Sequence, residues 1–186
     1  MKVIVGLGNV GKEFVNTRHN IGFLVIDYFL KKLKVKLNQE NFDCLYTLVK
    51  INNDNFLLAK PTTLMNLSGN CVQKIIDYYH ISSEDLIVFS DDLDQDLGKY
   101  KIRINCSCGG HNGLRDISTK IKTDNYLHFK IGIGRPKDKN IKDYVLGKFS
   151  KDDLDCFKKI FEKAYKLLQL ISLNSSINIA LSKLNN

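Results

Sequence analysis

The chain has 186 residues, a length typical of one compact domain, and 44% of them are hydrophobic, which excludes a disordered or low-complexity protein. The formal net charge of +8 predicts attraction to a polyanion, such as nucleic acid or an acidic membrane surface. We expect neither a signal peptide nor a membrane-spanning helix, because no apolar run approaches the roughly 20 residues that a span needs.

The cysteines are odd in number and scattered along the chain. They are Cys44, Cys71, Cys106, Cys108 and Cys156. A disulfide framework normally requires an even set with regular spacing, so we expect free thiols and a cytoplasmic location.

Short β-prone runs alternate with stretches of helical periodicity along the first two thirds of the chain. The predicted strands cover residues 2–7, 45–51, 55–60, 86–89, 100–104 and 128–133. The predicted helices cover residues 20–34, with Asn20 as N-cap, 72–79 and a short segment within 110–121. The turn Asn52-Asn53-Asp54 predicts a hairpin at an antiparallel edge, and the remaining alternation favours an α/β domain.

The last third of the chain is predicted to be helical. Apolar residues step by three and four from Leu154 to Ile171 and again from Ile177 to Leu184, which indicates two amphipathic helices. Core packing explains these apolar stripes better than partner binding does, because a helix without tertiary packing is marginal. No linker or repeat is evident, so we predict a single domain over residues 1–186.

A glycine-rich turn, Gly6-Leu7-Gly8-Asn9-Val10-Gly11, follows the first predicted strand and matches the G-x-G-x-x-G pattern of dinucleotide-binding proteins. In that pattern the helix begins within the glycines, so that its N-terminus meets the pyrophosphate. Here the helical periodicity begins only near residue 20. A plain turn is therefore favoured, unless Asn9 has a role of its own, and a dinucleotide-dependent oxidoreductase is a disfavoured alternative.

Four polar loops are expected at strand or helix ends, where α/β folds gather functional residues. They are Thr17-Arg18-His19-Asn20, Met65-Asn66-Leu67-Ser68-Gly69, Ser90-Asp91-Asp92 and Gly109-Gly110-His111-Asn112-Gly113. An isolated loop histidine such as His19 is usually a plain surface residue. Whether these loops form one site stays open from the residues alone.

Metal and covalent chemistry find little support in the sequence. Cys106-Ser107-Cys108 lies close to His111, but a structural zinc site needs four ligands and no second cysteine pair follows. No G-x-S-x-G nucleophile elbow is present. We therefore expect no metal and no cofactor, and zinc binding and thiol catalysis are minor alternatives.

Basic residues gather in the second half of the chain. They include Lys99, Lys101, Arg103, Lys130, Arg135, Lys137, Lys139 and Lys142. Each alone is usually a solvated charge, but near a site they can neutralise phosphates, and the affinity would then fall with salt. This distribution suits a ligand that carries phosphate groups.

Five motifs follow one another along almost the whole chain. They are Gly6-Leu7-Gly8-Asn9, Thr17-Arg18-His19-Asn20-Ile21-Gly22, Lys60-Pro61-Thr62-Thr63-Leu64-Met65-Asn66-Leu67-Ser68-Gly69, Gly109-Gly110-His111-Asn112-Gly113-Leu114 and Ile131-Gly132-Ile133-Gly134-Arg135-Pro136. In this order they resemble the bacterial-type peptidyl-tRNA hydrolase family, which cleaves the ester between a peptide and the 3'-terminal ribose of tRNA. The resemblance implies a mixed twisted sheet with helices on both faces and C-terminal helices bordering the cleft. It also implies a monomer that binds the acceptor stem and 3' end of peptidyl-tRNA and acts away from membranes.

By this resemblance His19 is the catalytic base and Asp91 is the carboxylate that orients it. The substrate-binding residues are Asn9, Phe14, Asn66 and Asn112. A neutral amide can donate to a developing oxyanion or accept from a peptide N–H, although turn capping is the alternative for each asparagine. Phe14 stands where the family has a tyrosine, so its hydroxyl is missing here.

The resemblance also implies a site loop and a phosphate grip. Met65 and His111 belong to the site loops, with His111 expected to shape its loop rather than to act chemically. Arg103 and Lys130 are expected to bind tRNA phosphate, and a lysine offers a point charge in place of a bidentate fork.

Other departures from the family pattern are Val10, Cys106 and Cys108. The competing interpretation is a non-catalytic RNA-binding relative that acts in intron splicing. The joint presence of His19, Asp91, Asn9 and Asn66 favours the enzyme.

Overall fold

The computed structural model describes residues 1–137, 140–174 and 176–184, and its strands form one mixed sheet in the order β2-β3-β4-β1-β5-β7-β6. The strands are β1 (Lys2–Gly6), β2 (Gln39–Asn41), β3 (Cys44–Ile51), β4 (Asp54–Pro61), β5 (Leu86–Asp92), β6 (Tyr100–Ile104) and β7 (Leu127–Gly132). The central strands β4, β1, β5 and β7 are parallel, so their carboxyl ends share one edge of the sheet. β3 pairs antiparallel with β4 and with β2, and β6 pairs antiparallel with β7.

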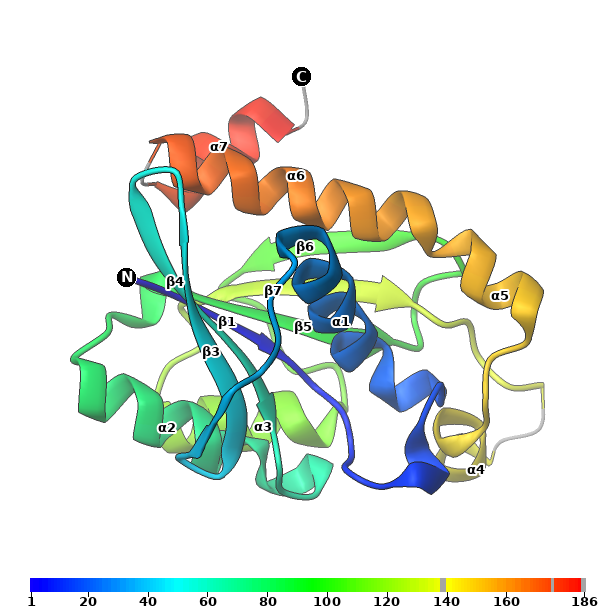
Figure 1. Ribbon diagram of the computed structural model, residues 1–186. Coiled ribbons are helices and arrows are strands. Elements are labelled where there is room, and N and C mark those ends of the chain that lie inside the picture. The colour runs from blue at the N-terminus through cyan, green and yellow to red at the C-terminus, as the bar shows by residue number, and fades with distance from the viewer. Residues whose placement is uncertain (138–139, 175, 185–186) are drawn as a thin grey trace.

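Helices cover both faces of this sheet. They are α1 (Ile21–Leu33), α2 (Ser68–Tyr79), α3 (Asn112–Ile121), α4 (Ile141–Leu146), α5 (Lys151–Cys156), α6 (Lys158–Asn174) and α7 (Ile177–Leu184), with 3-10 turns η1 (Lys12–Phe14), η2 (Arg18–Asn20), η3 (Met65–Leu67) and η4 (Ser83–Asp85). In Figure 1, α6 and α7 lie above the sheet and α2 and α3 lie below it. Within the part of the chain that the structure describes, no helix is long and apolar enough to cross a membrane.

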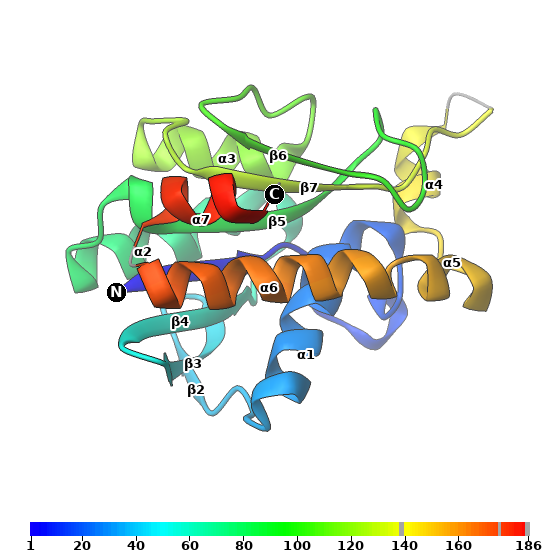
Figure 2. The ribbon, with the colours of Figure 1, turned by 90° about the horizontal axis from the view of Figure 1, so that it is seen from above.

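Alternate side chains of the central strands feed two separate cores. Ile4, Ile87 and Phe129 are buried with the α1 and α6 side chains, whereas Val3 and Val88 are buried with those of α2 and α3. Because both faces are covered, these strands read as nearly continuous apolar runs in the sequence. Figure 2, seen from above, shows α6 and α7 in front of the sheet, with α3 behind it.

The start of α1 is pressed against the sheet at one glycine. A Cβ on Gly22 would lie 2.3 Å from the backbone nitrogen of Leu7 and 2.4 Å from the carbonyl oxygen of Phe89. No residue with a side chain fits so close to the backbone of Leu7 and of Phe89. This contact holds the first turn of α1, and the η2 turn before it, at the carboxyl edge of β1 and β5.

The α/β fold class with a mixed sheet and helices on both faces is confirmed, and every predicted strand has a counterpart. One strand was missed, because β2 consists of three exposed polar residues and carries no hydrophobic signal. The predicted end of the strand near residue 89 was wrong: β5 continues through Asp92, since Ser90, Asp91 and Asp92 pair in register with β7.

The C-terminal helices also differ from the prediction. The stretch expected as one helix from Leu154 onward is divided at Phe157 into α5 and α6, and α5 begins at a capping box between Ser150 and Asp153. The six-residue α4 was not predicted, because it is too short to display a periodic apolar stripe.

Candidate active site

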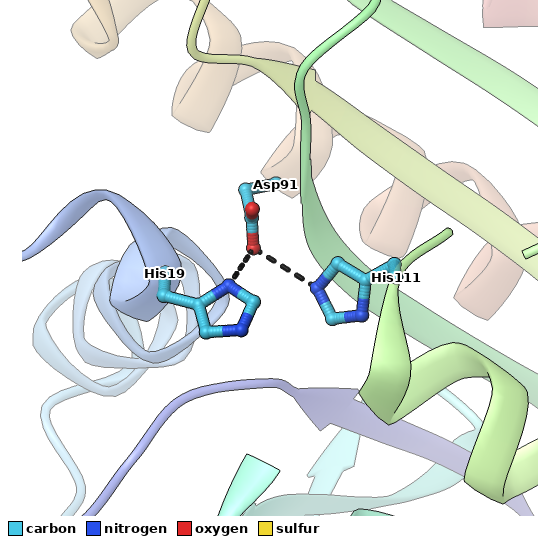
Figure 3. A group of neighbouring side chains, drawn as sticks. All are labelled: His19, Asp91 and His111. Atoms are coloured by element: carbon cyan, nitrogen blue, oxygen red, sulfur yellow. Dashed lines mark hydrogen bonds and ion pairs between the residues drawn. The ribbon is translucent and has the colours of Figure 1, made fainter. Parts of the chain in front are cut away.

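Three polar side chains meet at the carboxyl edge of the sheet (Figure 3). His19 lies in η2, directly before α1. Asp91 is the penultimate residue of β5, and His111 is the N-cap of α3. Residues far apart in the sequence are thus brought together by a helix start, a strand end and a second helix start.

One carboxylate oxygen of Asp91 accepts a hydrogen bond from each histidine. The distance from His19 Nδ1 to Asp91 Oδ1 is 2.8 Å, and that from His111 Nε2 to the same oxygen is 3.0 Å. The Asp91 side chain is only 3% exposed and that of His19 is 13% exposed. The carboxylate is therefore shielded from water, while the first histidine still reaches the surface.

The hydrogen bonds define which ring nitrogens carry protons. The backbone N–H of Leu114 donates to His111 Nδ1 over 3.3 Å, so this nitrogen keeps its lone pair and Nε2 carries the proton given to Asp91. His19 uses its Nδ1–H toward Asp91, which leaves the lone pair of Nε2 free. In Figure 3 this second nitrogen of His19 points away from the carboxylate.

The pKa values of Asp91 and His19 are shifted in opposite directions. Burial alone would raise the pKa of Asp91, but the electrostatic interactions and hydrogen bonds with His111 and His19 outweigh it and hold that pKa well below its usual range. Burial lowers the pKa of His19, whereas the charge and hydrogen bond of Asp91 more than compensate, so the pKa is raised overall. His19 is therefore a stronger base than an isolated imidazole.

Asn9 is held next to this group by a reciprocal bond with Asn20. The backbone N–H of Asn9 donates to Asn20 Oδ1 over 2.8 Å, and Asn20 Nδ2 donates to the carbonyl oxygen of Asn9 over 2.9 Å. Asn9 Oδ1 accepts from the backbone N–H of Met65 over 2.8 Å. Among the described residues Asn9 Nδ2 has no partner, so it is available as a donor.

The capping role predicted for Asn20 was wrong. Asn20 occupies the N-cap position of α1, but its side chain makes no capping hydrogen bond. Both ends of its amide are used by Asn9 instead. A buried tertiary contact satisfies two backbone groups of Asn9, whereas a cap would satisfy only one helix N–H.

The remaining residues of the site loops lie at two levels of burial. Met65 is buried, and a Cβ on Gly113 would lie 2.7 Å from its sulfur, so Met65 forms the wall beside the α3 start. Asn66 and Asn112 are exposed, at η3 and at the first turn of α3. Phe14, at the end of η1, is half-buried.

His111 shapes its loop, as expected, by capping α3 through its Nδ1. Its second bond, to Asp91, was not anticipated, because nothing in the sequence indicates that one carboxylate serves two histidines.

A second feature that the sequence did not predict is a clamp on the turn that carries His19, which Arg18 forms with Tyr144 and Gly147. The Arg18 guanidinium lies 4.3 Å from the centre of the Tyr144 ring, and the backbone N–H of Arg18 donates to the carbonyl oxygen of Gly147 over 3.0 Å. This clamp ties η2 to α4, which lies beside it in Figure 1.

The predicted phosphate-binding residues lie on β7 and β6, the two strands that follow β5 toward one edge of the sheet. Lys130 is on β7 and donates to the carbonyl oxygen of Ser107 over 2.9 Å, and Arg103 is exposed on β6. No described carboxylate forms an ion pair with either. Both cations are thus free to meet an anion. Lys139, another of the predicted basic residues, lies outside the described residues.

Cofactor and metal sites can be judged from the same geometry. No helix starts within the Gly6 to Gly11 turn, since α1 begins only at Ile21, so the dinucleotide interpretation lacks its anion-binding helix. The ligand atoms of His19, Asp91 and His111 lie within 4.8 Å of one another. A metal there would have to displace both protons that the rings donate to Asp91, so the arrangement favours a hydrogen-bonded group.

The fold and this site define the class: a small α/β enzyme with a carboxylate-oriented histidine at the carboxyl edge of a mixed sheet. Comparison with known proteins narrows the class. A sequence model of the family described as peptidyl-tRNA hydrolase matches residues 3–186, and the chain belongs to this family.

Relatives and solved structures agree with this assignment. The peptidyl-tRNA hydrolases of Staphylococcus aureus strains JH9 and Newman are 42% identical over 186 residues, covering 100% of this chain and 98% of theirs. A crystal structure of peptidyl-tRNA hydrolase from Acinetobacter baumannii superposes with a TM-score of 0.91 at 31% identity, covering 100% of this chain and 94% of that one. A complex of peptidyl-tRNA hydrolase with N-propanol gives the same TM-score and identity.

Proposed function

We propose that this member of the peptidyl-tRNA hydrolase family cleaves the ester between the peptide and the 3'-terminal ribose of tRNA by general-base catalysis, with residues 1–186 acting as one domain. The observation that carries the mechanism is the 2.8 Å hydrogen bond from His19 Nδ1 to Asp91, which leaves His19 Nε2 unprotonated and facing away from the carboxylate. That nitrogen is the base, and Asp91 orients it and stabilises its charged form.

The reaction proceeds through two proton transfers. His19 Nε2 takes a proton from water as the water oxygen bonds to the ester carbonyl carbon, and a tetrahedral oxyanion forms. The bond from carbon to the ribose oxygen then breaks, and His19 returns its proton to that oxygen. The products are a free peptide carboxylic acid and tRNA with a free hydroxyl.

Amide groups around His19 are proposed to bind the reacting peptide. Asn9 Nδ2 is the free donor in the inner site, and it suits the carbonyl oxygen where negative charge develops. Asn66 and Asn112 are exposed on flanking turns and suit contacts with the peptide backbone, which all peptide sequences share. Met65, His111 and Phe14 line and shape the surrounding loops.

The RNA part of the substrate is proposed to bind at the opposite side of the site. Arg103 and Lys130 supply charge for phosphates of the acceptor stem and 3' end. We further propose that the protein acts as a monomer in the cytoplasm, where its free cysteines stay reduced. A non-catalytic role in RNA splicing is not favoured, because it would not require the oriented His19.

The test is hydrolysis of N-acetylated aminoacyl-tRNA by the purified protein in the presence of a chelator. His19→Ala is expected to lower kcat by about 10² to 10⁴ while the circular dichroism spectrum is unchanged. His80→Asn is the matched control, since it removes an exposed histidine from the left-handed C-cap of α2, where asparagine is tolerated. Full activity in His19→Ala would overturn the mechanism.

A further inference from the structure

A hollow of about 230 Å³ opens beside Asn9, and no step of the mechanism uses it. We call it the Val10 pocket. Its apolar walls come from Val10, Val15, Phe23, Leu24, Leu45 and Pro61. Pockets for drug-sized ligands usually measure about 300 to 1,000 Å³, so this one suits one or two amino-acid side chains.

The Val10 pocket adjoins the active site. Asn9 and Asn20 line it, and Asn20 directly follows His19. The amide of Asn20 is fully used by the backbone of Asn9, and Asn9 Oδ1 is used by Met65. The polar groups that the pocket shares with the site are therefore largely satisfied, and an apolar occupant leaves few of them unpaired.

The charged groups at the rim compensate one another. Lys60 pairs with Asp27, and its ammonium lies 5.1 Å from the centre of the Phe23 ring. Among the described residues that line the pocket, a phosphate would find no unpaired cation, in contrast to the surface that carries Arg103 and Lys130. The pocket thus differs in chemistry from the surface proposed for RNA.

The sheet order places the two surfaces on opposite sides of His19. The pocket is formed by the segment that follows β1, by the first two turns of α1, by the end of β4 and by Leu45 of β3. Arg103 and Lys130 lie on β6 and β7. Asp91, on β5, lies between them in the order β3-β4-β1-β5-β7-β6. A substrate whose ester is at His19 and whose RNA runs toward β6 therefore directs its peptide toward β4.

Two apolar side chains that line the pocket are exposed to solvent. Val10 is 49% exposed and Val15 is 54% exposed, although both lie beside a buried polar site. We propose that the Val10 pocket is a subsite that binds an apolar side chain of the peptide part of the substrate. This proposal rests on the proposed function, because it assumes that peptidyl-tRNA binds with its ester at His19.

The experiment compares four substrates on one tRNA: N-acetyl-triglycyl-tRNA and the three versions in which leucine replaces one glycine. In the wild type, leucine at one position is expected to lower KM about tenfold relative to the triglycyl parent, because the gain from burying extra methylenes in an apolar pocket is of this order. The other two positions are expected to change KM little.

Substitutions in the Val10 pocket then test whether the pocket causes the lower KM of the preferred leucine substrate. Val15→Asp and Val10→Asp each place a carboxylate in the pocket. In each variant the ratio of KM for the triglycyl parent to KM for the preferred leucine substrate is expected to fall close to one. Leu173→Asp is the matched control on α6, where Leu173 is 68% exposed, and it should keep the tenfold preference. A ratio of KM values does not depend on the folded fraction, so partial misfolding does not imitate the result.

Three outcomes would overturn the subsite: equal KM at every leucine position, a preference that survives in both pocket variants, or an equal rise in KM for all four substrates in Val15→Asp. The last would assign the pocket to the RNA end. Hydrolysis of the parent by the wild type separates the two proposals. If the parent is cleaved without a leucine preference, only the subsite falls, and if it is not cleaved, the proposed function falls as well.

Discussion

At the scale of single residues, the central feature is that one oxygen of Asp91 serves two histidines. His111 donates through Nε2 and is locked in that tautomer by the Leu114 N–H, so it helps to keep the carboxylate charged. His19 benefits because a charged carboxylate raises its pKa against the opposing effect of burial. His111 is thus a positioning residue for Asp91 within the proposed mechanism.

The first prediction concerns the pH dependence of the reaction. His19 acts when Nε2 is unprotonated, so kcat/KM falls as the pH drops through its pKa, which in the wild type is raised. Asp91→Asn removes the charge that raises this pKa and leaves burial, which lowers it. The acid limb should therefore move to lower pH, with kcat reduced by about 10² to 10⁴.

The measurement is a profile of kcat/KM against pH for the two proteins. Asp92→Asn is the control, because Asp92 is the next residue on β5 and its carboxylate accepts from the backbone of Asp94 rather than from a histidine. An acid limb that stays in place in Asp91→Asn would contradict the assigned cause of the shift.

At the scale of elements, the position of His19 depends on how the η2 turn is tied to its surroundings. Three ties converge on it: the contact of Gly22 with Leu7 and Phe89, the reciprocal bond between Asn20 and Asn9, and the stacking of Arg18 on Tyr144 of α4. A turn held by partners from β5, from α4 and from the loop after β1 gives a rigid base for a catalytic side chain.

The second prediction tests the tie between Asn20 and Asn9. Asn20→Ala leaves a buried backbone N–H and a buried carbonyl of Asn9 without their present partners, and should lower the free energy of unfolding by about 2 to 4 kcal/mol. Urea denaturation measures this loss. Asn55→Ala, at an exposed position of β4, should change the same quantity by less than about 0.5 kcal/mol. Equal effects of the two substitutions would show that the reciprocal bond contributes nothing specific.

At the scale of the whole molecule, charge and topology divide the surface around His19 into two regions. The net charge of +8 favours long-range attraction of RNA, and Arg103 and Lys130 on β6 and β7 are proposed to bind its phosphates locally. The Val10 pocket lies on the opposite side of His19, toward β4, and its apolar residues Val10 and Val15 are exposed.

The third prediction separates local grip from net charge. Arg103→Ala should raise KM for whole peptidyl-tRNA by about tenfold and leave KM for a short 3'-end fragment nearly unchanged, because only the whole tRNA reaches Arg103. The slope of log KM against log salt should become shallower by about one phosphate contact. Lys166→Ala on α6 makes the same change in net charge and should affect neither substrate. An equal effect of Arg103→Ala on both substrates would remove its phosphate role.

Much of the fold could be predicted from the sequence, because the signals are local. The apolar run of β1, the 3.6-residue spacing of α1 and the turn between β3 and β4 each act over a few residues. Such signals fail where an element carries no apolar pattern, as in β2, or where it is too short, as in α4. The roles of His19 and Asp91 were predicted from the resemblance of motifs to a known family. Their hydrogen bond could be seen only in the tertiary structure.

The sequence by itself determined the class of fold, the alternation of its elements and the family resemblance, since these depend on periodicity and on runs of neighbouring residues. Only the tertiary structure decided that Asp91 is shared by two histidines, that Asn20 binds Asn9 rather than capping α1, and that Arg18 stacks on Tyr144. Those contacts join elements far apart in the chain. Strand order and packing determine which of them form, and no local pattern carries that information.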